Sequence, residues 1–462
     1  MHRRSLLVLL IVIVSIGAHA QSELSLKDAI RMAAANYPAL KAKAAYAKAS
    51  ELLVTAAQKE QLPNINLGLQ QDYGTINGTN GPLYGFGGLA TASSGPALAE
   101  QNWNAAFGAL YLTNVNWEFF AFGKYREKVK VARQVWQRDT KDLAQELFEQ
   151  KVKVAAAYLR LVASHQITKS YEKNRSRADS IRRFVIARVK NGLIAGVDSS
   201  LANAEYSSAQ IQLTNALDKE QEQRNILAQL IGSEDTGFTI DTVFVSRIPG
   251  SYLDTLAQAR EHPVLEYYRS RIAVSDQQAQ YIKTQYYPAF SVVGVWQSRG
   301  SGFESDYVTD QGHYTSGYWK GINPNRSNYL LGVGVTWNIM QPVRLSRQVS
   351  AQRQISNALQ EEYNTAALQL ATQLQTATTK MRNALSNYRE APVQVKAAGD
   401  AYHQKSVLYK NGLTNMVDVI QAGYTLVRAE TDRDIANNNL WQALLLKAAA
   451  AGDFDLFEDQ LN

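Results

Sequence analysis

The strongest constraint on this chain is a short motif that occurs twice, at an offset of 220 in the sequence numbering. Its copies are Val189–Leu193 and Tyr409–Leu413, and each contains Lys-Asn-Gly-Leu. Glycine tolerates the left-handed backbone conformation that ends many helices, so each copy predicts a helix C-terminus. Asp198 and Asp418 follow at matching positions, where we expect the N-cap of a returning helix. Each copy therefore predicts the tip of a long helical hairpin.

The duplication extends over most of the sequence. At the same offset of 220, Trp117 and Gly232 match Trp337 and Gly452, and at an offset of 225, Pro38 and Pro63 match Pro263 and Pro288. The change of offset places a five-residue length difference, and so a variable loop, between Pro63 and Trp117. Two copies of a unit of about two hundred residues are the basis for every further prediction.

Residues 1–20 read as a secretory signal peptide, with a basic start, a short apolar core and an Ala-His-Ala cleavage site. The apolar core is too short to span a bilayer, which takes about 20 residues. The remaining boundaries are a first repeat at 21–235, an equatorial linker at 236–258, a second repeat at 259–455 and a C-terminal tail at 456–462.

Local patterns predict the same elements in each repeat. In the first we expect helices at 24–35, 39–61, 121–190 and 197–231, strands at 64–73 and 103–120, and a loop at 74–101. In the second, strands at 290–296 and 329–339 flank a loop at 298–328. At about 1.5 Å per residue, a helix of seventy residues reaches ~100 Å. Pro392 falls inside the second long helix, where we expect an interruption and a kink.

The predicted strands alternate apolar and polar residues, with aromatic residues near their ends, as membrane β-strands do. Four strands cannot close a membrane barrel, which needs about eight, so several chains would share one. A basic cluster follows the outgoing strand in each copy: Lys124, Arg126, Lys128, Lys130 and Arg133, then Arg344, Arg347 and Arg353. These clusters fit lipid head groups and solvated helix starts equally well.

The residue inventory argues against an enzyme. Without the signal peptide the chain has four histidines, at 165, 262, 313 and 403, none at metal-ligand spacing with another, and it has no cysteine. Hydrolase, phosphate-loop and zinc-protease motifs are absent, so we expect no cofactor and no metal. The net charge of the mature chain, +5, is spread along predicted helices, which argues against nucleic-acid binding. His313 falls in a loop, where we expect it to be exposed.

Taken as an ordered set, the duplicated helices, strands, proline spacings and Gly-Leu tips resemble the TolC-type outer-membrane channels over residues 24–455. The resemblance implies a mixed α/β membrane protein, a homotrimer whose twelve strands, four per chain, form one β-barrel. A long periplasmic α-helical barrel would continue it. The location implied is the bacterial outer membrane, extending into the periplasm.

The function implied is the exit channel of a tripartite efflux pump or type I secretion system, conducting substrates passively. Its partners would be a periplasmic adaptor (membrane fusion) protein, an inner-membrane transporter reached indirectly, and outer-membrane lipid. A secreted coiled-coil scaffold or adhesin would explain the helices but not strands with apolar faces. A selective uptake pore would use many more strands per chain and no such long helices.

The resemblance also assigns roles to single residues. The tips resemble the family's contact with the adaptor: Gly192, Leu193 and Ile194, then Gly412, Leu413 and Thr414. Asp418 matches the first aspartate of the family's periplasmic constriction, whereas Gln421 replaces the second, and Thr414 replaces the arginine that latches the closed state. Three Asp418 carboxylates meeting in a trimer would raise the pKa of at least one. Helix capping alone would explain Asp418 equally well.

Overall fold

The computed structural model describes residues 23–78, 95, 97–242 and 262–461. The signal peptide and most of the linker predicted at 236–258 lie outside these ranges. The chain divides into two compact units. Described residues up to Ala49, together with 136–272 and 357–461, form the helical unit, and residues 50–135 and 273–356 form the unit that contains the β-sheet.

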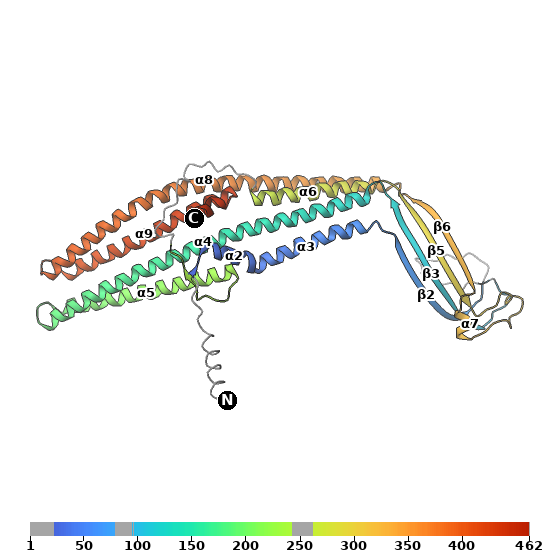
Figure 1. Ribbon diagram of the computed structural model, residues 1–462, viewed down its shortest axis with the longest axis horizontal. Helices are drawn as coiled ribbons and strands as arrows, with labels where there is room; N and C mark the ends of the chain where they lie inside the picture. The colour runs from blue at the N-terminus through green and yellow to red at the C-terminus, as the bar shows by residue number, and fades with distance from the viewer. Residues whose placement is uncertain (1–22, 79–94, 96, 243–261, 462) are drawn as a thin grey trace, which may run out of the picture. The chain divides into compact units, whose positions relative to one another are not determined.

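The first repeat has the expected helices, shown in Figure 1: α2 (Leu26–Asn36), α3 (Pro38–Lys59), α4 (Lys124–Lys190) and α5 (Gly196–Ile231). Ser25 begins α2, and its hydroxyl accepts a hydrogen bond from the Asp28 N–H at 3.1 Å. Tyr37 separates α2 from α3 because the residue before Pro38 avoids the helical region. α4 is a single helix of 67 residues.

The second repeat follows the same plan with α6 (Pro263–Thr284), α8 (Gln341–Lys410) and α9 (Met416–Ala451), followed by the short helices α10 (Asp455–Glu458) and η3 (Asp459–Leu461). The expectation that Pro392 interrupts the long helix is wrong, because α8 is one helix of 70 residues that contains Pro392. One proline removes a single backbone hydrogen bond. Ala391, Ala398 and neighbouring helical turns stay packed on either side, which explains why the helix holds.

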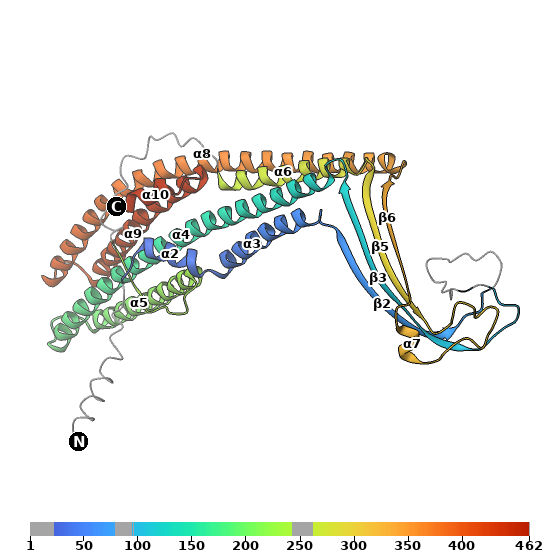
Figure 2. The same cartoon turned by 45° about the vertical axis from the view of Figure 1, so that its right-hand side comes forward.

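The sheet is antiparallel, in the order β2-β3-β5-β6. Its strands, visible in Figures 1 and 2, are β2 (Asn64–Thr75), β3 (Ala105–Phe120), β5 (Ala289–Ser301) and β6 (Arg326–Thr336). β5 extends further than expected and β6 lies three residues earlier. A short helix, α7 (Tyr318–Ile322), lies in the β5–β6 connection, which the sequence pattern had assigned wholly to loop. β2 and β6 are the edges of this sheet.

The two faces of the sheet differ in polarity. On the face shared by Ile65, Leu67, Tyr329, Leu331 and Val333, large apolar side chains are 62 to 81% exposed. Paired residues of the opposite face include Asn66 with Asn114 and Gln70 with Leu110, so that face carries polar and apolar side chains together. An exposed apolar face is unusual for a sheet in water. It is the arrangement that a lipid-facing surface requires.

The helical unit has its own core, where α2, α4, α5, α8 and α9 meet around Tyr158, Leu227, Leu444 and Trp441, all almost fully buried. The short strand β1 (Glu23–Leu24) pairs in parallel with β4 (Thr239–Ile240) beside this core. The Tyr158 hydroxyl donates to the Leu24 carbonyl at 2.7 Å, which fixes β1 against α4. None of the helices in the described ranges combines the length and the apolar character that crossing a membrane requires.

Candidate functional site

Both hairpin tips have the predicted capped turn. Gly192 and Gly412 adopt left-handed φ angles of 70° and 77°. The N–H of Leu193 donates to the Arg188 carbonyl, and that of Leu413 to the Leu408 carbonyl, each at 2.9 Å. Together with the glycine N–H bonds, these contacts form a Schellman motif at each tip. The sequence-based prediction of two helical hairpins is therefore confirmed.

Each tip presents one leucine to solvent. Leu193 is 62% exposed and Leu413 is 72% exposed. Ile194 and Thr414, which follow them, are half-buried, and Ile194 packs against an apolar cluster below the tip. A rigid turn that carries an exposed leucine offers a small apolar contact to a partner.

The structure brings the two tips together within the helical unit. Buried Val185 and Ala202 of the first hairpin pack against Tyr409, Met416 and Val419 of the second. The Arg188 guanidinium donates to the Lys410 carbonyl at 2.8 Å. The Tyr409 hydroxyl donates to the Asp198 carboxylate, also at 2.8 Å. Burial and this carboxylate raise the pKa of Tyr409 well above that of a free tyrosine.

The prediction that Asp198 and Asp418 are N-caps is wrong. The helices begin earlier, so both aspartates lie in the first turn, and the N-cap residues are Ala195 and Asn415. The Asn415 side chain accepts the Asp418 N–H at 2.9 Å, whereas Ala195 makes no side-chain cap. A carboxylate in the first turn still interacts favourably with the helix dipole, which explains why both copies carry one.

Asp418 is bound within its own hairpin. Its carboxylate accepts the Lys405 ammonium at 2.8 Å and the Thr414 hydroxyl at 2.7 Å. These bonds, that of Lys405 first, lower the pKa of Asp418 from its ordinary value within one chain, and the rise expected for three clustered carboxylates in a trimer stays a prediction. The prediction had omitted the neighbouring lysine. Gln421 lies exposed on α9, three residues after Asp418 and on the same helix face.

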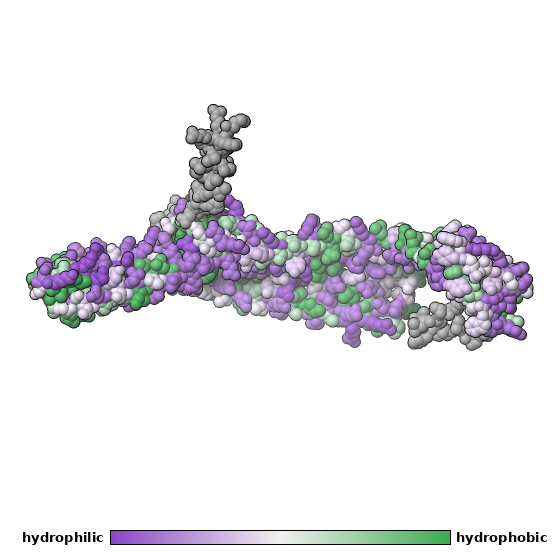
Figure 3. Space-filling view, turned by 90° about the horizontal axis from the view of Figure 1, so that it is seen from below, coloured by the Kyte–Doolittle hydropathy of each residue, from purple (hydrophilic) through white to green (hydrophobic). Residues whose placement is uncertain are grey.

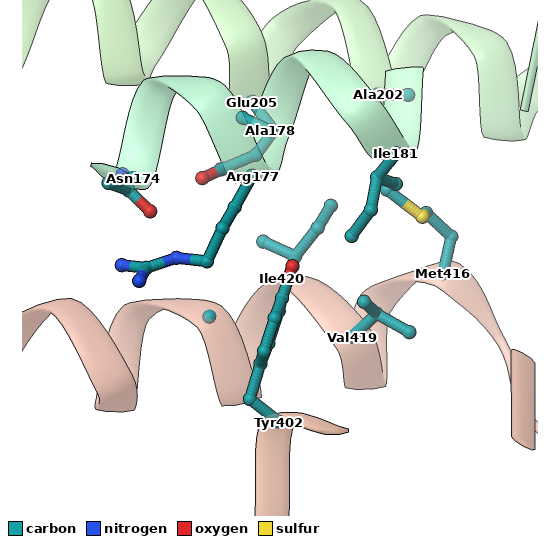
Figure 4. Close-up of a pocket in the computed structure, with 11 residues that line it drawn as sticks. Asn174, Arg177, Ala178, Ile181, Ala202, Glu205, Tyr402, Met416, Val419 and Ile420 are labelled. Carbon is teal, nitrogen blue, oxygen red and sulfur yellow. The ribbon is translucent and has the colours of Figure 1, made fainter. Parts of the chain in front are cut away.

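A pocket lies between the two hairpins, further along them from the tips (Figure 4). Arg177 on α4, Glu205 on α5, Tyr402 on α8 and Ile420 on α9 are among its lining residues. Arg177 makes a two-pronged ion pair with Glu430 at 3.0 and 2.7 Å. Burial raises the pKa of Glu205 and outweighs the hydrogen bond from Tyr424 that opposes it. These contacts hold the hairpins to each other, and the sequence-based prediction did not include them.

His313 is exposed, as expected, but it is also bonded. Its Nδ1 lies 2.7 Å from an Asp306 carboxylate oxygen and its Nε2 lies 3.4 Å from Asp310. The hydrogen bond to Asp306 raises the pKa of His313 above its ordinary value. Within the described ranges, no three His, Cys, Asp or Glu residues are placed to hold a metal ion. Exposed apolar residues also occur along the helices, scattered among polar ones, as the surface in Figure 3 shows.

Comparison with known proteins supports the resemblance on two independent grounds, a family profile and solved structures. The profile of the outer membrane efflux protein family matches residues 29–233 of this chain. Among curated protein sequences, none matches it.

Several solved structures share the fold. The outer membrane protein VceC of Vibrio cholerae superposes with a TM-score of 0.71 at 18% identity, covering 93% of this chain and 96% of its own. CusC, described in connection with folding and transmembrane channel formation, gives 0.74 at 12% identity and covers 95% and 96%. The open state of the Neisseria gonorrhoeae MtrE outer membrane channel gives 0.68 at 13% identity and covers 93% and 89%.

Matches at this level of identity establish the fold over nearly the whole chain, and the family profile covers most of the first repeat. The expected resemblance is confirmed: residues 29–233 match the profile of the outer membrane efflux protein family, and the chain has the fold of the TolC-type outer-membrane channels.

Proposed function

We propose that the protein is the outer-membrane exit channel of a tripartite efflux pump or of a type I secretion system. In this proposal three chains form one twelve-stranded β-barrel, continued into the periplasm by a barrel of the long helices. Substrates pass through it passively, and the chain itself catalyses no reaction. The partners are two further copies, a periplasmic adaptor, outer-membrane lipid and, through the adaptor, an inner-membrane transporter.

One observation carries the assembly: a four-stranded sheet with an exposed apolar face and two edge strands, β2 and β6. An open edge leaves N–H and C=O groups unpaired, which hydrocarbon does not tolerate. Pairing β6 of one copy with β2 of the next satisfies both edges. Three copies then give twelve strands, within the range of membrane barrels, while a single copy would give too few.

The mass of the protein in detergent tests this assembly. Light scattering of purified mature protein, corrected for bound detergent, is expected to give three chain masses, and the trimer is expected to separate on heating. Circular dichroism should show more helix than strand. A monomer in detergent, or a protein that stays dispersed in buffer without detergent, would contradict the proposal. The second result would favour a secreted coiled-coil scaffold.

The hairpin tips are the proposed contact with the adaptor. Support comes from their rigid Schellman turns and from the exposure of Leu193 and Leu413 beside the left-handed glycines. Gly192, Ile194, Gly412 and Thr414 set the shape of this contact.

Charge at the tips tests the contact. Leu193→Asp combined with Leu413→Asp is expected to abolish adaptor copurification while leaving the trimer intact, because burying a carboxylate against an apolar partner is unfavourable. Asn191→Asp adds a charge two residues away but keeps both leucines, and serves as the control. Unchanged copurification of the double variant would show that the tips are only turns.

Asp418 remains the proposed periplasmic constriction, with Gln421 three residues beyond it. The pairing with Lys405 changes the expected electrostatics. A ring of three carboxylates, each bound to a lysine, attracts cations less strongly than three free carboxylates would. Cation block at this position is therefore expected to be present but weak.

A further inference from the structure

The helix α7 lies on the apolar face of the sheet. The face is identified by the side chains that α7 touches: the Tyr318 ring lies 5.1 Å from that of Phe107, and the Tyr111 hydroxyl donates to the Ile322 carbonyl at 3.0 Å. Phe107 and Tyr111 lie on the same face of β3 as Thr113 and Val115, and β2 continues this face with Leu69 and Leu67. α7 therefore lies on the exposed apolar face of the sheet, called the apolar belt below.

Two glycines let α7 approach the strands closely. A Cβ on Gly321 would lie 2.5 Å from the Phe107 carbonyl oxygen, and one on Gly300 would lie 2.7 Å from the Ile322 carbonyl carbon. Neither gap admits a side chain without movement of the backbone. Ile322 is buried at this contact, and the Tyr318 hydroxyl donates to Gln71 on β2 at 2.9 Å. α7 is thus fixed to three elements of the sheet unit and is not a loose loop.

The exposed side of α7 is amphipathic. Trp319 is 78% exposed, although it is the largest side chain of the helix, and its ring lies against that of Tyr318 at 5.1 Å. Lys320, beside it, forms an exposed ion pair with Glu304 at 3.1 Å. Tryptophan and tyrosine next to lysine are the residues enriched where hydrocarbon meets polar head groups.

The position of α7 along the strands matches the thickness of a membrane. At the other end of the same face, Trp117 and Trp337 are held in equivalent ways, with their indole N–H groups donating to the Gln61 and Tyr286 carbonyls at 2.8 and 3.1 Å. Trp117 follows Phe107 along β3 by ten residue steps. They rise about 34 Å along the strand, or about 26 Å along the axis of a barrel tilted by about 40°. The apolar band of outer-membrane barrels is about 25 Å tall.

We infer that α7 anchors the sheet in the outer leaflet of the membrane. The helix lies at the boundary between acyl chains and head groups, with Trp319 inserted among the lipids. Trp117 and Trp337 mark the opposite boundary, so the sheet is held at a fixed depth from both ends. This inference rests on the proposed function, because it takes the apolar face of the sheet to be the lipid-facing face.

Fluorescence quenching in lipid vesicles tests the inference. The signal of Trp319 is the difference between the wild-type protein and Trp319→Phe, and that of Trp296, midway along the belt, comes from Trp296→Phe. Vesicles carry lipids brominated either near the head group or near the chain end. Trp319 is expected to be quenched more by the shallow bromines, and Trp296 more by the deep ones.

Two results would overturn the inference. If Trp296 is quenched by the deep bromines while Trp319 responds only to aqueous iodide, the barrel spans the membrane but α7 lies in water. If neither tryptophan responds to brominated lipid, the sheet does not enter the membrane, and the proposed function fails as well. Gly321→Val provides the structural control: by undocking α7 it is expected to shift the Trp319 emission to longer wavelength while the Trp296 signal is kept.

Discussion

The two hairpin tips carry the same aspartate and use it differently. In the first copy, Asp198 accepts a hydrogen bond from Tyr409 of the second hairpin. In the second copy, Asp418 accepts bonds from Lys405 and Thr414 of its own hairpin. One carboxylate therefore ties the hairpins together, and the other is held within a single hairpin.

The difference comes from positions where the copies diverge. Lys405, Thr414 and Asn415 correspond, at the offset of 220, to Val185, Ile194 and Ala195. Three polar partners of Asp418 thus have apolar counterparts around Asp198, which leaves Asp198 available to a partner outside its own hairpin. In this duplicated chain, residues that are the same in both copies form the turn. Residues that differ between the copies determine which groups contact the aspartate.

The largest loss of stability is expected on substitution of Gly452, which has a left-handed backbone like Gly412 but also has close neighbours. Gly452 and Gly412 have nearly equal φ angles, 74° and 77°, but a Cβ on Gly452 would lie 2.8 Å from His262, whereas Gly412 has nothing within 4 Å. Gly452→Ala is expected to cost about 3 kcal/mol of stability and Gly412→Ala about 1 kcal/mol, from strain alone. Thermal unfolding followed by circular dichroism gives both values. Equal losses would show that close packing at Gly452 contributes nothing.

The unequal N-caps predict opposite changes at the two tips. Asn415→Ala removes a side-chain cap and is expected to destabilise the protein by about 1 kcal/mol. Ala195→Asn places the same cap on α5, whose cap residue already has an extended backbone, and is expected to stabilise by a similar amount. The same unfolding measurement applies. A gain at position 415 or a loss at position 195 would contradict the comparison.

The bond between the hairpins is expected to contribute less. Tyr409→Phe keeps the buried ring and removes only the hydroxyl that binds Asp198, so a loss of about 0.5–1.5 kcal/mol is expected. Tyr409→Phe combined with Asp198→Ala should cost little more than either change alone, because both remove the same bond. Full additivity in this double-mutant cycle would show that the two groups do not interact.

The smallest effect is a pH dependence confined to the second tip. The pKa of Asp418 is lowered in the folded chain, mainly by Lys405. A lowered folded pKa means that the stabilisation is present above the ordinary aspartate value of 3.8 and is lost as the pH falls through the folded pKa. Lys405→Met should therefore flatten the acid limb of a plot of unfolding temperature against pH. An unchanged acid limb would mean that this exposed pair adds no stability.

Much of the fold could be predicted from the sequence because it repeats. The constant offset between the two copies located both tips, and proline, glycine and period-two patterns located most helices and strands. Some predicted strand ends differ from the observed ones, because the alternation of side chains and the pairing of the backbone do not stop at the same residue. Trp337 continues the apolar alternation, yet β6 ends at Thr336, because the backbone pairing with β5 ends at the pair of Ala289 with Thr336.

The contacts within the site could not be predicted in the same way. Tyr409 and Asp198 are far apart in sequence, and their bond depends on how the two hairpins pack. The N-cap at Asn415 was missed because an aspartate three residues later offered an equally good cap. α7 was missed because five residues in a polar, glycine-containing connection give no helical period.

Single-channel recording in planar bilayers tests the central claim most directly, because it requires a pore and a constriction together. The wild-type trimer is expected to give discrete conductance steps with weak divalent-cation block. Asp418→Asn is expected to reduce that block further, whereas Asp198→Asn is expected to leave it unchanged, because in the proposed channel Asp198 belongs to the other hairpin and does not line the pore. The absence of conductance steps would contradict the channel. Equal effects of the two variants, or no effect of Asp418→Asn, would place the constriction elsewhere.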